Sequence, residues 1–306
     1  MVSPQTVERV REAAQSLGYR VNRVARGLKT NRSFTIGMLV PDITNPFFPP
    51  MVRGAEDGFA QAGYTLVLAD TDNDAGKERR TQTVMLERQV DGLLLATARR
   101  RDPVIDDLLA TSVPFVLVNR TIDRGGVAAV IPDDQAGMAL AVDHLYELGH
   151  RVIGHVAGPS GTSTGSRRAA GFVAAVRSLG LEPGPVVEVG SFTLDAARAV
   201  ADALLTGPSR PSAIVAANDL IALGTLDAAR TLGLTCPRDL SLVGFNDMPF
   251  IDLLEPPLTT IRINEYELGM RASQMLLSLI EDPGARRETI MLAPELVVRG
   301  STVAHA

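Results

Sequence analysis

The chain contains a single cysteine, no tryptophan and few other aromatic residues among its 306 residues. One cysteine, Cys236, allows no internal disulfide and no cluster of thiolate metal ligands, which excludes a disulfide-stapled secreted scaffold and fits a reducing compartment. No apolar run approaches the roughly 20 residues that a membrane-spanning helix needs. Met1–Tyr19 lacks the apolar core of a secretory signal, so we expect a cytoplasmic protein without a membrane partner.

The remaining composition is that of a folded protein with more than one structural unit. Hydrophobic residues make up 45% and charged residues 21% of the chain, which excludes a disordered or collagen-like polypeptide. Because single hydrophobic cores rarely grow beyond about 250–300 residues, the length suggests two lobes or one large domain.

The net charge of −5 is distributed unevenly. Residues 1–33 carry seven Arg and Lys residues against Glu8 and Glu12, a net charge of +5, which leaves −10 for residues 34–306. Because Lys and Arg that neutralise phosphates supply most non-specific affinity for nucleic acids, the basic segment suggests an anionic polymer as its partner. A solvated basic tail accounts for the charge alone equally well.

From Phe34 onward, apolar runs of strand length alternate with longer segments whose apolar residues recur at helical spacing. This alternation predicts an α/β fold with parallel sheets covered by helices on both faces. The strands are too numerous for one ordinary sheet, so we expect two doubly wound parallel-sheet lobes that divide near Pro132. The predicted strands are Phe34–Val40, Thr65–Asp70, Gly92–Ala96, Phe115–Asn119, Ala128–Ile131, Val152–Ala157, Val186–Val189, Ala213–Ala216 and Leu240–Gly244, with short terminal strands near Ile290 and Val297.

Both ends of the chain carry helical patterns. Pro4–Leu17 reads as a helix with Ser3 as its N-cap, and Val24–Leu28 is a second pattern too short to be stable alone. Toward the C-terminus, the Pro-rich segment Glu255–Thr260 is interpreted as a crossing between the lobes, and Tyr266–Ile280 as the last helix.

One string imitates a hydrolase. Gly161–Gly165 matches the G-x-S-x-G pattern of a nucleophile elbow, with Ser163 as the nucleophile. The elbow needs a sharp turn at a strand end, whereas four residues intervene here, and the only later histidine for a triad is His305. A flexible loop that contacts a ligand is the better interpretation.

Two further patterns carry little functional information. His144, His150 and His155 do not stack on one helix face and lack accompanying acids, so we expect no metal site there. Arg99–Arg101 is most simply a solvated approach to a helix. No phosphate-binding P-loop motif occurs, and we expect neither a cofactor nor an enzymatic activity.

Four strands end abruptly in polar or aromatic side chains. Asn45 and Phe47–Phe48 follow the first strand, and Asn119, Asn218 and Asn246 follow three others. Because open α/β sheets bind ligands at the carboxyl ends of their strands, we expect these residues to converge on one cleft. Adjacent phenylalanines cannot both face one core, which predicts that one of the two is available to a ligand. Helix capping explains each asparagine taken singly but explains the set poorly.

Six longer strings occur in a specific order: LGYRVNRVARGL from Leu17, VPDITNPFF from Val40, VDGL from Val90, HLYELGH from His144, ANDLIALG from Ala217 and PLTTI from Pro257. In this order and spacing the chain resembles the lactose-repressor (LacI-type) family of bacterial transcription regulators, whose core is similar to periplasmic sugar-binding proteins. The resemblance covers essentially the whole chain.

The resemblance implies a type I periplasmic-binding-protein-like core over residues 34–306. The implied first lobe spans about 34–131 plus 262–288, and the second spans about 132–261 plus 289–306. Arg168 would donate to ligand hydroxyls, and Phe192 would stack on the ligand. The effector contacts implied position by position are Asn45, Phe47, Phe48, Asn119, Arg120, Arg168, Phe192, Asn218 and Asn246.

Residues 1–33 match only part of the family's DNA-binding headpiece, followed by its hinge helix. Val2–Val10 echoes a recognition helix, but the residues after it place it as the third headpiece helix, so we expect the base-reading helix to be absent from this chain. Without base contacts, the expected DNA affinity is weak and non-specific. The implied DNA contacts are Tyr19, Asn22, Arg23, Ala25 and Leu28, of which Leu28 matches the minor-groove wedge.

The function implied by the resemblance is repression by a homodimer that binds DNA and responds to a small sugar-like effector. Closure of the lobes around the effector would alter the fit of the paired hinge helices to DNA. The alternative is a solute-binding protein without a DNA-binding role, against which the basic segment and the lack of a secretory signal count. A doubly wound enzyme is disfavoured because no nucleophile, base and orienting group are assembled.

The charge of the effector follows from two amides. Asn119 and Asn246 stand where many sugar-binding members have Asp, which leaves Arg120 and Arg168 with less negative charge around them. We therefore hypothesise that the effector is a sugar carrying a carboxylate or phosphate. The alternative is that Asp42 or Asp247 balances the arginines and the effector is neutral.

Overall fold

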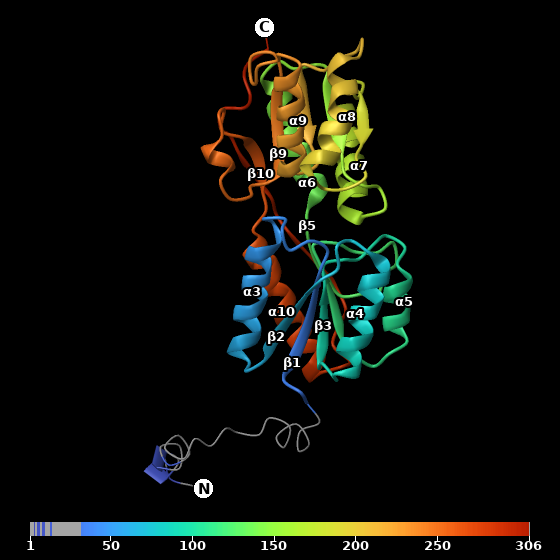
Figure 1. Ribbon diagram of the computed structural model, residues 1–306, viewed down its shortest axis with the longest axis vertical. Coiled ribbons are helices and arrows are strands. Elements are labelled where there is room, and N and C mark those ends of the chain that lie inside the picture. Colours follow the sequence, from blue (N-terminus) through green and yellow to red (C-terminus); the bar gives the residue numbers. More distant parts are fainter. Residues whose placement is uncertain (1–2, 4, 7, 10–12, 14–31, 306) are drawn as a thin grey trace.

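The structure, a computed structural model, describes residues 3, 5–6, 8–9, 13 and 32–305. From Thr35 onward these residues form two α/β lobes stacked end to end along the long axis of the molecule (Figure 1). Each lobe contains one six-stranded sheet. The predicted fold class, two doubly wound lobes with parallel sheets, is confirmed.

The first lobe has the strand order β11-β5-β4-β3-β1-β2, and all its pairings are parallel. Apolar side chains project from both faces of β1: Met38 packs in the cluster that includes α3 and α10, and Leu39 in the cluster with α4 and α5. The elements are β1 (Thr35–Val40), α3 (Phe48–Gln61), β2 (Thr65–Asp70), α4 (Ala75–Glu87), β3 (Gly92–Leu95), α5 (Pro103–Leu109), β4 (Phe115–Val118), β5 (Ala129–Pro132), α10 (Glu265–Glu281) and β11 (Thr289–Leu292).

The second lobe has the strand order β12-β10-β9-β8-β6-β7, in which only the edge strand β12 runs antiparallel to its neighbour. Its elements are α6 (Asp134–Glu147), β6 (Ile153–Ala157), α7 (Ser163–Ser178), β7 (Val186–Glu188), α8 (Leu194–Thr206), β8 (Ala213–Ala216), α9 (Asp219–Thr231), β9 (Ser241–Asn246), a 3₁₀ turn (Ile251–Leu253), β10 (Thr259–Arg262) and β12 (Glu295–Val297).

Two expectations about the C-terminal third are wrong. Residues 289–306 were expected in the second lobe, but β11 pairs with β5 in the first sheet, and only β12 joins the second. The segment Glu255–Thr260 was expected to cross between the lobes, but its last residues begin β10, which pairs with β9 and β12 in the second sheet, and the crossing comes after β10. The β-branched run of Thr259, Thr260 and Ile261 is the signal that favours this strand, and the neighbouring prolines obscured it.

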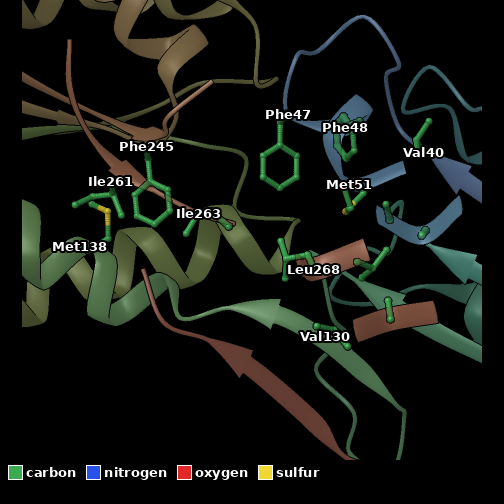
Figure 2. Packing of buried hydrophobic residues seen from close by; sticks show 14 of the residues in the cluster. Val40, Phe47, Phe48, Met51, Val130, Met138, Phe245, Ile261, Ile263 and Leu268 are labelled. Carbon is green, nitrogen blue, oxygen red and sulfur yellow. The ribbon is translucent and has the colours of Figure 1, made fainter. Parts of the chain in front are cut away.

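The chain passes between the lobes after β5, after β10 and after β11. β5 and β10 both reach the junction with their carboxyl ends, so the carboxyl ends of their parallel neighbours lie there too. Apolar packing is continuous across the junction, since Phe47 and Phe48 of the first lobe share one buried cluster with Phe245 of the second. Figure 2 shows the Phe47 ring between Phe245 and Phe48.

The N-terminal segment is described only in part. Ser3 accepts a hydrogen bond from the Thr6 amide at 3.3 Å, which agrees with its predicted role as N-cap, and the described residues from Gln5 to Ala13 are helical. The predicted hinge helix and the predicted DNA contacts Tyr19, Asn22, Arg23, Ala25 and Leu28 lie outside the described residues. Among the described residues, no helix is both long and apolar enough to cross a membrane.

Candidate functional site

Backbone and side-chain hydrogen bonds connect the two lobes beside the strand ends. The amide of Thr121, after β4, donates to Ser163 Oγ at the start of α7 over 2.9 Å. The amide of Arg100 donates to the carbonyl of Gly161 at 3.0 Å, and its guanidinium donates to Ser160 O at 3.5 Å. The Gly161–Gly165 string is therefore a contact between lobes.

The interpretation of Arg99–Arg101 as solvated is wrong for two of the three residues. Arg100 bridges the lobes and also forms an ion pair with Asp123 at 2.9 Å. Arg99 is half-buried and forms an ion pair of 2.9 Å with the buried carboxylate of Glu78. Only Arg101 is exposed. The run of three arginines could not predict these ion pairs, because the partners Glu78 and Asp123 come from distant segments of the chain.

Arg168, on α7, is fixed by three contacts at the carboxyl edge of the second sheet. Its Nε donates to Asp134 Oδ1 at 2.8 Å, and its second donor reaches the carbonyl of Ala217 at 2.6 Å. The guanidinium carbon lies 3.8 Å from the centroid of the Phe245 ring, a cation–π contact. Since Asn218 and Asn246 directly follow Ala217 and Phe245, these contacts hold Arg168 beside both predicted asparagines.

Asp134, which is not among the effector contacts expected from the sequence, supplies the negative charge that Arg168 needs. The two side chains are 2% and 3% exposed, so both ions of the pair lie out of water. Burial raises the pKa of Asp134, and the Arg168 charge and hydrogen bond oppose that rise. In the sequence, Asp134 resembles an ordinary acidic residue in the first turn of a helix, a position that the helix dipole favours on its own.

Arg120, at the end of β4, is as deeply buried as Arg168 but has no comparable partner. It is 5% exposed, and its Nε finds no hydrogen-bond acceptor among the described residues. Its guanidinium lies 5.9 Å from the ring centroid of Phe192, which belongs to the second lobe. Burial, with the nearby charges of Arg99 and Arg168, lowers the pKa of Arg120 to about 10, so the side chain stays protonated at neutral pH.

Phe192 is held in place by its neighbour in the fold. Its ring packs so closely on Gly158, after β6, that any side chain there would collide with it. The ring is partly exposed and faces Arg120 across the junction. This position agrees with an aromatic surface for a ligand between the lobes.

Asn119 and Asn246 occupy equivalent positions in the two sheets. Asn119 directly follows β4, and Asn246 is the last residue of β9. Both have a positive backbone φ, 65° for Asn119 and 120° for Asn246, a sign of φ at which asparagine is enriched among residues other than glycine. Each Oδ1 is buried without a hydrogen-bond donor among the described residues. Neither asparagine caps a helix, so the capping explanation fails at both positions.

Asn218 and Asn45 have local structural roles. Asn218 is the N-cap of α9, and its Oδ1 accepts from the Ile221 amide at 2.8 Å. Asn45 Oδ1 accepts from the Phe47 amide at 3.1 Å and so forms the turn before α3. Helix capping therefore explains the position of the Asn218 side-chain oxygen.

Phe47 and Phe48 are both 3% exposed and belong to the same cluster, so the expectation that only one could face a core is wrong. Their rings meet edge to face at 5.2 Å. The turn at the start of α3 sends Phe48 toward Met51 in its own lobe and Phe47 toward Phe245 in the other (Figure 2). Phe47 therefore closes the apolar side of the junction.

The three histidines have separate partners. The ring of His150 contacts Ser212 and Ser241, that of His155 contacts the carbonyl of Val215, and that of His144 contacts Thr302. Among the described residues, no group of three or more His, Cys, Asp or Glu side chains is placed to hold a metal ion.

Taken together, the junction collects polar atoms that lack partners. Of the five buried side-chain N and O atoms without a hydrogen bond among the described residues, three belong to the predicted effector contacts: Asn119 Oδ1, Arg120 Nε and Asn246 Oδ1. Buried polar groups without partners are rare in proteins and call for a specific explanation. Hydroxyl groups of a small polar molecule could donate to the two asparagine oxygens, and an oxygen of the same molecule could accept from Arg120 Nε.

Comparison with known proteins gives a consistent result. Residues 142–302 match the family model of a periplasmic binding protein-like domain. The chain is similar to the ribose operon repressor of Halalkalibacterium halodurans, with 34% identity over 301 residues that cover 98% of this chain and 89% of the repressor.

Two solved structures are similar over most of the chain. A LacI family transcriptional regulator from Enterococcus faecium with bound ribose has a TM-score of 0.78 at 29% identity, covering 89% of this chain and 100% of that one. The lac repressor dimer bound to operator and the anti-inducer ONPF has a TM-score of 0.84 at 26% identity, covering 94% of this chain and 100% of that one.

Proposed function

The chain belongs to the LacI family of transcriptional regulators, and on this premise we propose that it is a repressor that binds a small sugar-like effector between its two lobes. In this proposal the basic segment of residues 1–33 binds DNA. The protein acts as a homodimer in the cytoplasm. The observation that carries the proposal is a set of three buried polar atoms at the lobe junction that have no hydrogen-bond partner in the described part of the chain: Asn119 Oδ1, Arg120 Nε and Asn246 Oδ1.

The mechanism follows from where these atoms lie. Asn119 and Arg120 belong to the first lobe and Asn246 to the second, so a ligand that satisfies all three connects the lobes. Because such a ligand binds one relative position of the lobes better than another, it shifts the population toward that position. In a dimer, this shift changes the spacing of the two DNA-binding segments and hence their affinity for DNA.

A catalytic role receives no support from the same residues. Ser163 Oγ is occupied by the Thr121 amide. His305 stacks on His150 at 5.0 Å, and His150 precedes β6, at the end of the second lobe that is remote from the junction. A serine and histidine at opposite ends of a lobe cannot act together on one substrate.

The proposal is tested with glycine substitutions at the two asparagines. Because both have a positive φ, Asn119→Gly and Asn246→Gly remove the amide without straining the backbone. A panel of sugars, sugar acids, sugar phosphates and nucleosides is added to the wild type, and thermal unfolding and the fluorescence anisotropy of labelled DNA are recorded. We expect at least one compound to raise the melting temperature and change the anisotropy, and each glycine variant to weaken both effects.

The matched control is Gln89→Gly, an exposed residue whose φ is also positive, at 55°. It should leave both ligand effects intact. If no compound alters DNA binding, or if both asparagine variants respond like the control, the function proposed for this site is wrong.

A further inference from the structure

The buried charge at the lobe junction is not balanced. Arg168 is paired with Asp134, and Arg99 is paired with Glu78. Arg120 forms no ion pair and no side-chain hydrogen bond with any residue of the described part of the chain, although it is 5% exposed. The junction therefore holds one guanidinium more than its paired carboxylates account for.

The two aspartates that the sequence offered as compensation are occupied elsewhere. Asp247 forms ion pairs with Arg262 at 2.7 Å and with Arg299 at 2.6 Å. Asp42 accepts hydrogen bonds from the backbone and hydroxyl of Thr44 at 2.9 and 2.6 Å. The alternative of a neutral effector with an internal counter-charge at these positions is therefore not supported.

A buried guanidinium without a partner is unfavourable unless something else supplies negative charge. The charged groups that act on Arg120 are the cations Arg99 and Arg168 and the carboxylate of Glu78. The carboxylate of Glu78 already accepts hydrogen bonds from Arg99 and from the Thr97 hydroxyl. Because the charges of Arg99 and Arg168 are balanced by Glu78 and Asp134, the charge of Arg120 itself is the one that stays uncompensated among the described residues.

The position of Arg120 favours a ligand between the lobes over a solvent ion. Its guanidinium faces Phe192 of the second lobe. The next residue, Thr121, binds Ser163 at the start of α7, so the positive end of a 16-residue helix lies beside it. The orphaned oxygens of Asn119 and Asn246 complete the site with acceptors that require hydroxyl or amine donors.

We propose that Arg120 binds an anionic group of the effector, so that the effector is an acidic sugar derivative, bearing a carboxylate or a phosphate, and its hydroxyls donate to Asn119 and Asn246. This inference rests on the proposed function and assigns the ligand class of the same site. Arg168, already neutralised by Asp134, then contacts the sugar without selecting its charge.

The test compares matched neutral and anionic probes. Thermal unfolding and titration calorimetry are carried out with D-glucose, D-glucuronate and D-glucose 6-phosphate, with D-ribose and D-ribose 5-phosphate, and with inorganic phosphate alone, at constant ionic strength. We expect the wild type to be stabilised by inorganic phosphate at millimolar concentration and by at least one anionic sugar more than by its neutral partner. Glucuronate and glucose 6-phosphate distinguish the two anionic groups.

Three variants assign the effect to the residue. Arg120→Gln should weaken binding of the preferred anionic probe by at least about tenfold, the effect of losing a charged hydrogen bond. It should also leave the ligand-free protein at least as stable as the wild type. Asn119→Asp, which tolerates the same backbone conformation, adds a carboxylate next to Arg120 and should weaken anionic probes selectively. Arg198→Gln, which removes an exposed cation paired with Asp227, is the control and should change neither.

The outcomes separate this inference from the proposed function. Neutral sugars that stabilise the protein as well as their anionic partners, and change DNA binding, overturn only the anionic class. The inference also fails if no anionic probe shifts the melting temperature of the wild type, or if Arg120→Gln and Arg198→Gln respond alike.

Discussion

At the scale of single residues, the two arginines predicted from one pattern have different roles. Arg168 contacts Asp134, Ala217 and Phe245, whereas the Arg120 side chain has, among the described residues, only the Phe192 ring as a partner. Breaking a buried ion pair by removing one partner is expected to cost about 3–5 kcal/mol, because the other charge stays buried and unpaired.

Asp134→Asn should therefore lower the free energy of unfolding by about 3–5 kcal/mol, measured by urea denaturation. The control is Glu267→Gln, which breaks an exposed pair with Arg271 of 2.6 Å and should cost no more than about 0.5 kcal/mol. Equal urea midpoints for the two variants would contradict the role given to Asp134.

His155 makes stability depend on pH. Burial lowers the pKa of its ring from 6.5 to about 4, and the ring contacts the carbonyl of Val215 at 2.7 Å. Because the unfolded chain takes up this proton below about pH 6.5 and the folded protein only near pH 4, the contribution is present above pH 6.5 and is lost as the pH falls toward 4.

At about 1.4 kcal/mol per unit of pKa, the loss amounts to at most roughly 3 kcal/mol. His155→Gln should therefore gain stability relative to the wild type between pH 7.5 and pH 4.5, as read from chemical denaturation at both values. His144→Gln, whose ring is partly exposed, should gain less. A difference between wild type and His155→Gln that stays constant with pH would sink the idea.

At the scale of elements, the closest packing in the first lobe joins α3 to α10. A side chain at Gly54 would collide with the carbonyl of Tyr266, and one at Gly269 would collide with the carbonyl of Met51. Both obstacles are backbone atoms, which cannot move aside without separating the helices. Because α10 follows the crossing from β10 back to the first lobe, its contact with α3 also anchors that crossing segment to the first lobe.

Gly269→Ala should destabilise the protein by about 1–3 kcal/mol or more, because the added methyl group overpacks a rigid contact. Gly76→Ala, in the exposed first turn of α4, meets only side-chain atoms at 3.2 Å and should be neutral or stabilising by up to about 1 kcal/mol. Thermal unfolding of both variants decides the matter, and a tolerated Gly269→Ala would mean that the two helices can separate freely.

At the scale of the whole molecule, the hydrogen bond between Thr121 and Ser163 is one of the contacts that join the lobes. This contact brings the two chain positions close enough for a disulfide, for which the Cα atoms must lie within about 7 Å. The native thiol does not compete, because burial raises the pKa of Cys236 to about 12 and leaves little reactive thiolate.

The double variant Thr121→Cys with Ser163→Cys should form an intramolecular disulfide under mild oxidation, which intact mass and non-reducing electrophoresis report. Locking the lobes in this way should slow ligand entry and release. Thr121→Cys with Ser178→Cys, at the opposite end of α7, is the control and should not cross-link. Equal cross-linking of both pairs would show that the lobes do not hold this arrangement in solution.

The sequence by itself determined the alternation of strands and helices, the division into two lobes and the family, because these depend on local periodicity and on strings read along the chain. It also placed Asn119, Arg120 and Asn246 at or just after strand ends, and the family resemblance added Arg168 on the helix that follows β6. The extents of most predicted strands differ from the observed ones by only one or two residues at either end.

Only the tertiary structure decided which charges are paired. Asp134 looked like a helix-start residue and Glu78 like one of several charges on α4, yet both are buried partners of arginines that come from distant segments. The sheet to which β11 belongs was likewise decided by the tertiary structure, because its pairing with β5 depends on the path of the chain after α10. Pairing depends on which distant residues the fold brings together, and local patterns do not contain that information. For the same reason the sequence could not show that Arg120, unlike Arg168, has no carboxylate partner among the residues that the structure describes.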